Sequence, residues 1–129
     1  MNRPIRFKAW CYAEQKWASN LTIYPGGSFQ VAILKTIDSE SILDWRHYRK
    51  EDVLVQWTGF YDLLGVPIWE SDIVYDIAEG YFQVFWRSDL AQFVARMDGI
   101  CDLSLGLNQF KWKVVGNIFE NPELLNQLP

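Results

Sequence analysis

Four carboxylates lie close together in the middle of the sequence, where an acid–base pair or a divalent cation would need them. They are Asp62, Glu70, Asp72 and Asp76. Two neighbouring carboxylates can divide the roles of acid and base, and carboxylate oxygens bind hard cations. However, residues 70, 72, 74 and 76 alternate with the apolar residues 73, 75 and 77, which predicts a strand with one solvated face. We therefore expect no catalytic or metal-binding role for this group, and we expect Asp62 to accept backbone hydrogen bonds in the turn that ends at Gly65.

The other reactive residue types lack the partners that catalysis requires. His47 is the only histidine, and a histidine without a fixed carboxylate or cysteine partner is a poor activating base. The sequence contains no G-x-S-x-G motif and no glycine-rich phosphate loop. Cys11 and Cys101 are far apart and in apolar contexts, so we expect buried thiols rather than a disulfide or a metal pair. The sequence predicts a non-enzymatic protein with no catalytic residue, no metal and no cofactor.

One short segment combines aromatic and basic side chains. Between residues 45 and 50 the sequence is "WRHYRK", followed at once by the acidic pair "ED". Such a composition can stack bases and neutralise phosphates, but it is equally typical of a solvated face or of a protein contact surface. The three interpretations stay open at this point. The candidate interaction surface consists of Trp45, Arg46, His47, Tyr48, Arg49 and Lys50.

Composition limits the class of protein. The chain of 129 residues suffices for one domain, residues 1–129, and its 50% hydrophobic and 22% charged residues are typical of a folded soluble chain. No apolar run has the length of a membrane span and no secretory signal is evident, so we expect a cytoplasmic protein. A net charge of −4 argues against general affinity for nucleic acid. The seven tryptophans exceed what one modest core requires, so some of them are expected at an interface.

The elements that must position these residues are mostly short strands. Alternating apolar residues predict strands within residues 3–11, 21–24, 29–33, 53–58, 72–77, 81–87, 92–98 and 110–115. Residues 38–52 do not alternate, and a short helix capped by Asp38 or Ser39 and an irregular loop both stay open for them. At the C-terminus, Asn121 followed by Pro122 predicts the start of a short helix. The sequence therefore indicates an all-β or β-rich, barrel-like fold of short antiparallel strands, with a short C-terminal helix and a helical insertion if residues 38–52 form one.

Three segments of the chain resemble a known family when they are taken in order. They are "IRFKAW", "VQWTGFYDLLGVPIWESDIVYD" and "VVGNIFENPELL". They are similar to the I-x-F-R-A-W, Q-Y-T-G-L-x-D-x-x-G-x-x-I-Y-E-G-D-I-V and V-I-G-N-I-Y-E-N-P-E-L-L segments of the YopX protein family of phages and prophages. The resemblance implies a β-rich, barrel-like fold and a phage origin, but no reaction. It implies structural roles for Trp10, Gly59, Asp62, Gly65, Asp72, Gly116, Asn117, Asn121 and Pro122.

The chain departs from the family pattern at a few positions. Cys11 stands where the family commonly has aspartate, and Val66 and Pro67 stand where it often has lysine and glutamate. Ser71 replaces the glycine that precedes D-I-V. Because serine rarely adopts a left-handed backbone, this replacement predicts an ordinary conformation at position 71.

The function that these observations favour is protein binding. We expect a phage- or prophage-encoded module that binds a copy of itself or a host or phage protein, because aromatic residues are abundant and no catalytic constellation is present. One alternative is a nucleic-acid-binding protein that uses "WRHYRK" on a barrel edge. The other is an inhibitor of a host defence or transcription component, in which the acidic charge mimics nucleic acid.

Overall fold

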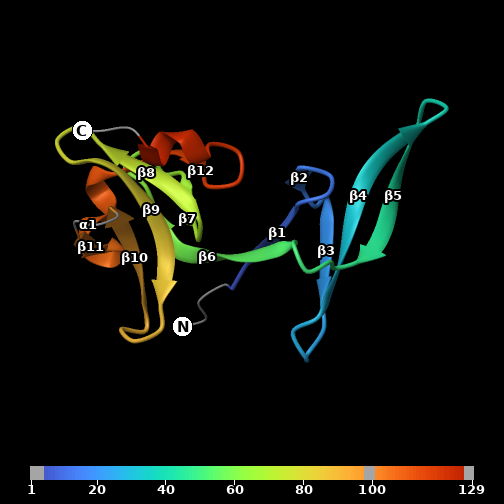
Figure 1. Cartoon of the computed structure of the whole chain (residues 1–129), viewed down its shortest axis with the longest axis horizontal. Coiled ribbons are helices and arrows are strands. Elements are labelled where there is room, and N and C mark those ends of the chain that lie inside the picture. Colours follow the sequence, from blue (N-terminus) through green and yellow to red (C-terminus); the bar gives the residue numbers. More distant parts are fainter. Residues whose placement is uncertain (1–4, 98–100, 127–129) are drawn as a thin grey trace. The chain divides into compact units, whose positions relative to one another are not determined.

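The computed structural model describes residues 5–97 and 101–126, and they divide into two compact units (Figure 1). Phe7–Val55 forms one, here the N-terminal unit. Residues 5–6 and the described residues from Gln56 onward form the other, here the C-terminal unit. Each unit has a hydrophobic cluster of its own. The composition of the chain did not indicate two separate clusters. That residues 1–129 form a single domain stays a prediction.

The N-terminal unit consists of a small hairpin and a three-stranded antiparallel sheet. Strands β1 (Phe7–Cys11) and β2 (Lys16–Trp17) pair with each other. The sheet has the order β3-β4-β5, formed by β3 (Asn20–Ile23), β4 (Phe29–Ile37) and β5 (Glu40–His47). Alternate residues of β4 face the core, which consists of Ala9, Cys11, Phe29, Val31 and Ile33. Burial ends at Ile33, because every residue from Leu34 to Trp45 is exposed.

Residues 40–47 form a strand, so neither the helix nor the loop expected for this segment is present. β4 and β5 pair without a register shift from Gln30 and His47 to Ile37 and Glu40. The two residues between them, Asp38 and Ser39, have φ values of 51° and 67°. Positive φ at both central residues is the geometry of the tight hairpin turn whose twist matches that of the strands. The polar pair that suggested a helix cap therefore closes a β-hairpin.

The C-terminal unit is built on a curved five-stranded antiparallel sheet (Figure 1). Its order is β11-β10-β9-β8-β12, formed by β8 (Asp72–Asp76), β9 (Gly80–Arg87), β10 (Gln92–Met97), β11 (Cys101–Ser104) and β12 (Lys113–Asn117). β6 (Val53–Tyr61) begins in the N-terminal unit, ends in this one and pairs there with β7 (Pro67–Trp69). The core consists of Ile68, Val74, Phe82, Val84, Phe93, Ala95, Leu105 and Trp112. This architecture confirms the predicted β-rich, barrel-like class.

In residues 5–97 and 101–126, helical structure is limited to three short segments. They are α1 (Leu105–Asn108) and the two 3-10 turns η1 (Gln109–Lys111) and η2 (Pro122–Asn126). η2 begins at Pro122, as predicted, but Asn121 does not cap its first turn. The Asn121 Oδ1 instead accepts a hydrogen bond from the Asn117 N–H, at 3.3 Å, and so closes the preceding loop. No helix in the described ranges is long and apolar enough to cross a membrane.

Ser71 contradicts the conformation that its residue type predicts. Its φ is +75°, in the left-handed region. Its N–H donates to the Val84 carbonyl at 2.7 Å and its carbonyl accepts from the Ile118 N–H at 3.0 Å. These two bonds tie the turn before β8 to its neighbours and hold the strained backbone in place. Position 71 therefore adopts the left-handed conformation that favours glycine although it carries a serine.

Replacing Ser71 with glycine should stabilise the protein. A left-handed non-glycine residue costs about 1–2 kcal/mol, and the added freedom of glycine in the unfolded chain offsets part of that gain. We expect Ser71→Gly to raise the free energy of unfolding by about 0.5–1 kcal/mol, measured by urea denaturation. Ser88, which is not at positive φ, supplies the matched control, and Ser88→Gly should lower stability slightly. Equal effects of the two substitutions would contradict a strained Ser71.

Candidate interaction surface

Asp62 is a structural hub of the C-terminal unit. Its Oδ1 accepts hydrogen bonds of 2.8 Å from the N–H groups of Leu64 and Val66, inside the turn where the sequence placed it. Its Oδ2 accepts a third, of 2.9 Å, from the N–H of Val114 in β12. The side chain is buried. Asp62 therefore shapes the turn and also fastens it to a strand 52 residues away in sequence.

The other carboxylates of the central motif also accept backbone hydrogen bonds. Asp72 is buried and accepts from the Trp69 N–H at 2.8 Å, while Glu70 and Asp76 accept from the N–H groups of Gln56 and Glu79. The solvated strand face expected for them is wrong. Ile73 and Val74 point to opposite faces of β8 and both are buried, so both faces of this strand are covered there. Within the described ranges, no three His, Cys, Asp or Glu side chains gather where they could hold a metal ion.

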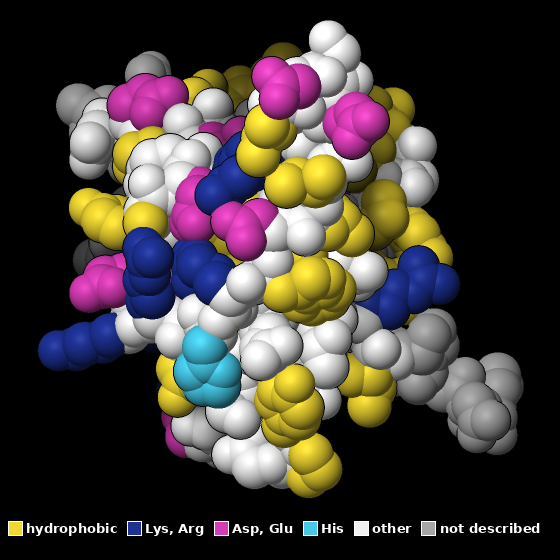
Figure 2. Space-filling view, turned by 90° about the vertical axis from the view of Figure 1, so that its right-hand side faces the viewer, with side chains coloured by type: hydrophobic (Ala, Val, Ile, Leu, Met, Phe, Trp, Pro, Cys, Tyr) yellow, Lys and Arg dark blue, Asp and Glu magenta, His cyan; other side chains and the backbone are white. Residues whose placement is uncertain are grey.

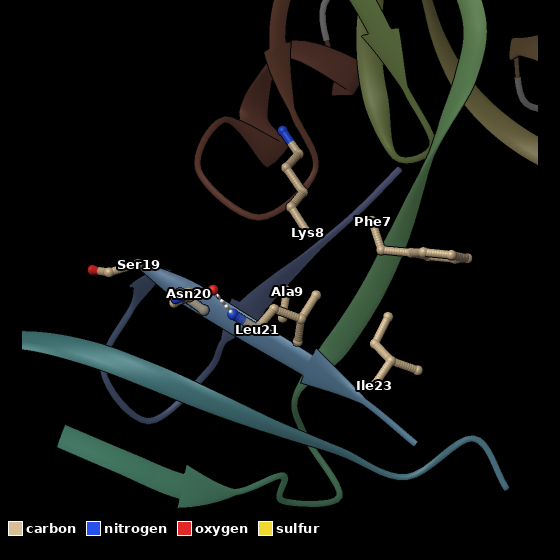
Figure 3. A pocket seen from close by; sticks show the side chains of 8 residues that line it. Phe7, Lys8, Ala9, Ser19, Asn20, Leu21 and Ile23 are labelled. Atoms are coloured by element: carbon tan, nitrogen blue, oxygen red, sulfur yellow. Dashed lines mark hydrogen bonds between the residues drawn. The ribbon is translucent and has the colours of Figure 1, made fainter. Parts of the chain in front are cut away.

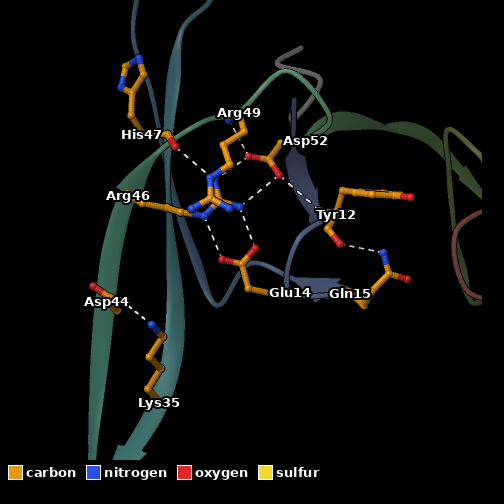
Figure 4. Close-up of polar contacts among 9 residues, drawn as sticks. All are labelled: Tyr12, Glu14, Gln15, Lys35, Asp44, Arg46, His47, Arg49 and Asp52. Atoms are coloured by element: carbon orange, nitrogen blue, oxygen red, sulfur yellow. Dashed lines mark hydrogen bonds and ion pairs between the residues drawn. The ribbon is translucent and has the colours of Figure 1, made fainter.

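Arg46 lies at the centre of an ion-pair cluster that the sequence did not reveal. Its guanidinium contacts Glu14 at 2.8 Å and Asp52 at 2.7 Å, and it also donates to the His47 carbonyl (Figure 4). Asp52 accepts further bonds from the N–H groups of Arg49 and Tyr12. The side chain of Asp52 is 1% exposed and that of Arg46 17%. The cluster joins β5 to the β1–β2 turn, so the guanidinium is bound within the unit rather than presented to a phosphate.

The pKa directions in this cluster agree with its geometry. The hydrogen bond from Arg46 lowers the pKa of Glu14 below its ordinary value of 4.5. Burial by itself would raise the pKa of Asp52, but the hydrogen bonds from Arg46 and the Arg49 N–H outweigh it and lower that pKa below 3.8. Both carboxylates raise the pKa of Arg46. Burial, and secondly Asp52, raise the pKa of the Cys11 thiol to about 11, which marks it as an inert core residue.

The remaining residues of "WRHYRK" do not form one surface with Arg46. Because neighbours on a strand point to opposite faces, Trp45 and His47 lie on the face opposite to Arg46. Tyr48 follows the strand and stacks on Phe29, with the ring centroids 4.6 Å apart. Arg49 and Lys50 lie exposed in the loop before β6. The structure thus divides the six residues among two strand faces and a loop.

The projecting end of the β4–β5 hairpin is an apolar surface that sequence reasoning missed. Residues directly opposite each other on paired strands share a face. One face of residues 34–45, here called the β4–β5 ribbon, carries Leu34, Leu43 and Trp45. The other carries Ile37 and Ile42 beside the ion pair of Lys35 and Asp44. Apolar residues are therefore exposed on both faces. In the sequence they stand among polar residues without clear alternation, so the pattern did not indicate this surface.

Two of the tryptophans that the structure describes are exposed. Trp10, Trp57 and Trp112 are buried, and Trp17 and Trp69 are partly buried. Trp45, at 42% exposed, lies on the β4–β5 ribbon, and Trp86, at 45%, lies in the C-terminal unit. Figure 2 shows hydrophobic side chains between acidic and basic ones on one face of the molecule. Five of the seven tryptophans are therefore buried or partly buried, and two are exposed and available for contacts.

Two shallow hollows lie on the surface, one in each unit. In the N-terminal unit, Phe7, Leu21 and Ile23 line a hollow between β1 and β3, with Lys8 at its rim (Figure 3). In the C-terminal unit, Trp86 and Glu70 are among the residues that line the second hollow. The lining of the first hollow includes Lys8 and Ser19, but the two side chains point away from each other (Figure 3), and the residues that line the second include Glu70 but no nucleophile. Neither hollow therefore changes the expectation that the protein is not an enzyme.

Residues of the family motifs occupy positions with specific structural demands. A Cβ atom on Gly116 would come within 2.5 Å of the Asn121 Oδ1, so the loop that Asn121 closes requires glycine there. Gly59, at φ +86°, lies where the register of β6 and β7 shifts. Other motif residues are Trp10, which packs edge-on against Trp17; Gly65, at φ +81°; and Asn117, whose Oδ1 accepts from the N–H groups of Phe119 and Glu120.

Removing the Arg46 guanidinium should destabilise the protein strongly. Arg46→Ala leaves Asp52 buried without its countercharge, and breaking a buried pair in this way typically costs about 3–5 kcal/mol. Since Asp52 keeps two backbone donors, we expect a loss of about 2–3 kcal/mol in the free energy of unfolding by urea denaturation. Lys35→Ala breaks the exposed pair with Asp44 as a control and should cost less than about 0.5 kcal/mol. Similar losses in both variants would refute a structural role for the cluster.

The same cluster predicts a loss of stability in acid. The pKa values of Glu14 and Asp52 are lower in the folded chain, so the unfolded chain takes up protons first as the pH falls. The stabilisation is complete well above pH 4.5 and is lost as the pH falls through 4.5 and 3.8 toward the folded pKa values. Urea midpoints measured across this interval should fall more steeply for the wild type than for Arg46→Met. Parallel curves would contradict the assignment.

Comparison with known proteins agrees with the geometry. The family described as YopX protein matches residues 6–126. Protein EF1440 from Enterococcus faecalis is 22% identical, with a TM-score of 0.65 over 96% of this chain and 99% of its own. Protein yopX from Bacillus subtilis is 15% identical, with a TM-score of 0.57 over 92% and 95% of the two chains. No curated protein matches the sequence. The two structures share the fold, and the family match over nearly the whole chain shows that this protein belongs to the YopX family.

Proposed function

We propose that the protein is a non-enzymatic, phage- or prophage-encoded module that works in the bacterial cytoplasm by binding a protein, either a second copy of itself or a host or phage protein. The observation that carries this proposal is the β4–β5 ribbon. All residues from 34 to 45 are exposed, and five of them are large and apolar. A two-stranded ribbon is only marginally stable in water. A partner that covers this ribbon would remove the exposed apolar surface and reinforce the hairpin.

The way in which the chain uses its chemically capable residues supports a role other than catalysis. Asp62 and Asp72 are buried and accept hydrogen bonds from backbone N–H groups. Asp52 is bound by Arg46. Cys11 is buried in the core, where its pKa is raised. Each of these groups therefore serves the fold, and a reaction would need others.

Nucleic-acid binding is the weaker alternative, because Arg46 is already bound by two carboxylates. The cations of "WRHYRK" that lie exposed are Arg49 and Lys50. Salt-dependent binding to single-stranded DNA or RNA that is lost in Arg49→Ala/Lys50→Ala would support this alternative. Arg46→Ala is unsuitable for the test because it should destabilise the protein.

Substitutions on the β4–β5 ribbon should weaken binding. We expect the wild type to form oligomers in light scattering or to capture a specific protein from host lysate. Leu34→Ser/Trp45→Ser should weaken that binding by about 30-fold or more, which corresponds to the loss of at least one interface hot spot of about 2 kcal/mol. The matched control, Trp86→Ser, removes the exposed tryptophan of the other unit and should leave binding unchanged. A wild type that is strictly monomeric and captures no protein would refute the proposal, whereas capture of a defence or transcription component would identify an inhibitor.

A further inference from the structure

We propose that β5 pairs antiparallel with β5 of a second copy, about a two-fold axis at Leu43, so that two three-stranded sheets become one of six strands. The inference rests on the proposed function and names the partner and the contact. β5 is an edge strand of the β3-β4-β5 sheet, and in the described part of the chain no strand lies beyond it. Its eight residues contain no proline or glycine, and its pairing with β4 has no bulge.

The outward backbone groups of β5 follow from its register. The Tyr48 N–H donates to the Phe29 carbonyl, which makes this pair a hydrogen-bonded one. In an antiparallel ladder such pairs alternate with pairs that do not exchange hydrogen bonds. Even-numbered residues of β5 therefore bond to β4. The N–H and C=O groups of Ser41, Leu43 and Trp45 point to the free edge, ready for another strand, whereas the His47 carbonyl already accepts from the Arg46 guanidinium.

The opposite edge of the same sheet, strand β3, is less suited to pairing than β5. β3 has only four residues, and the Leu21 N–H is bound at 2.8 Å by the side-chain oxygen of Asn20. Natural sheets use short strands and local side-chain devices of this kind to prevent unwanted pairing. β5 carries neither device along its eight residues, all of which except Arg46 are exposed. This contrast favours β5, not β3, as the edge strand that pairs with a second copy.

The charges and sizes of the β5 side chains favour one register for the pairing of the two β5 strands. A two-fold axis at Asp44 would place Asp44 opposite its own copy, and an axis at Ile42 would place Glu40 opposite Asp44, both unfavourable like-charge pairs. An axis at Trp45 pairs only residues 43–47. An axis at Leu43 pairs residues 40–46 and places Trp45 opposite the small Ser41. Glu40 then lies opposite Arg46. We expect this pair of opposite charges to add little stability, because Glu14 and Asp52 already bind the Arg46 guanidinium.

The same register joins the apolar faces of the two ribbons. Leu34, Leu43 and Trp45 lie on one face of each ribbon. About the axis at Leu43, the two copies of Leu43 lie side by side and the two copies of Leu34 flank them. The exposed apolar residues therefore meet across the new strand pair and form one continuous strip. This arrangement uses identical surfaces of both copies and is closed, as expected for a dimer.

Single cysteines on β5 test this register. In hydrogen-bonded pairs the Cα atoms lie about 5.5 Å apart, within the range for a disulfide. In a Cys101→Ser background, Leu43→Cys should therefore give a covalent dimer on mild oxidation. Trp45→Cys alone should not, because the two copies of residue 45 would be offset by four residues, about 13 Å along the strands. A mixture of Ser41→Cys and Trp45→Cys proteins should cross-link again, and Leu34→Cys on β4 is the control that should not.

The outcomes separate this inference from the proposed function. Cross-linking of Trp45→Cys but not Leu43→Cys would overturn the register, and oligomers without any β5 cross-link would overturn the β5 contact, while protein binding would stand in both cases. A monomer that still captures another protein would also overturn self-pairing alone. As an independent measure, Leu43→Pro removes one outward N–H and leaves the bonds to β4, so it should weaken self-association at least tenfold. Circular dichroism should show the hairpin intact, since edge positions tolerate proline.

Discussion

The N-terminal unit depends on how one buried carboxylate is neutralised. Asp52 lies almost fully buried beside a core that includes Cys11, and a charge in that position is tolerated only with a paired cation and satisfied hydrogen bonds. Arg46 supplies the cation, Glu14 shares it, and two backbone N–H groups complete the shell of Asp52. The pairing anchors the base of β5 against the β1–β2 turn. It also explains why the basic segment around Arg46 is less available to an external anion than its composition suggests.

Beyond this anchor the hairpin has no core to cover. Burial on β4 stops after Ile33, yet the strand pairing continues for four more residues to the turn at Asp38 and Ser39. The result is a ribbon that is exposed on both faces and carries apolar residues on each. A short cluster of five buried residues cannot cover a hairpin of this length. The surface proposed for protein binding therefore arises where the core ends, and the free backbone edge of β5 gives that surface a direction and a register.

Much of the fold followed from local patterns, and the failures have identifiable causes. Alternation located most of the strands, β8 and β9 among them, and the Asp62 turn lies where residue types placed it. Residues 38–47 were missed because both faces of the ribbon are exposed, so polar and apolar residues do not alternate clearly. The solvated face assigned to Asp72 was wrong because side chains on both faces of β8 are buried, among them Ile73 and Val74. Ser71 misled because the backbone bonds that hold its left-handed conformation come from residues far along the chain.

The sequence by itself determined the family, the β-rich class and the turn organised by Asp62, because these depend on residue types at short and regular spacing. Gly116 and Asn121 illustrate this, since their motif encodes a contact between near neighbours. Only the tertiary structure decided which charges are available. The ion-pair cluster brings together Arg46, Glu14 and Asp52 from separate segments of the chain, and the local sequence around them does not predict the pairing. It also decided that β5 is a free edge, because strand order is a property of the assembled sheet and not of any one strand.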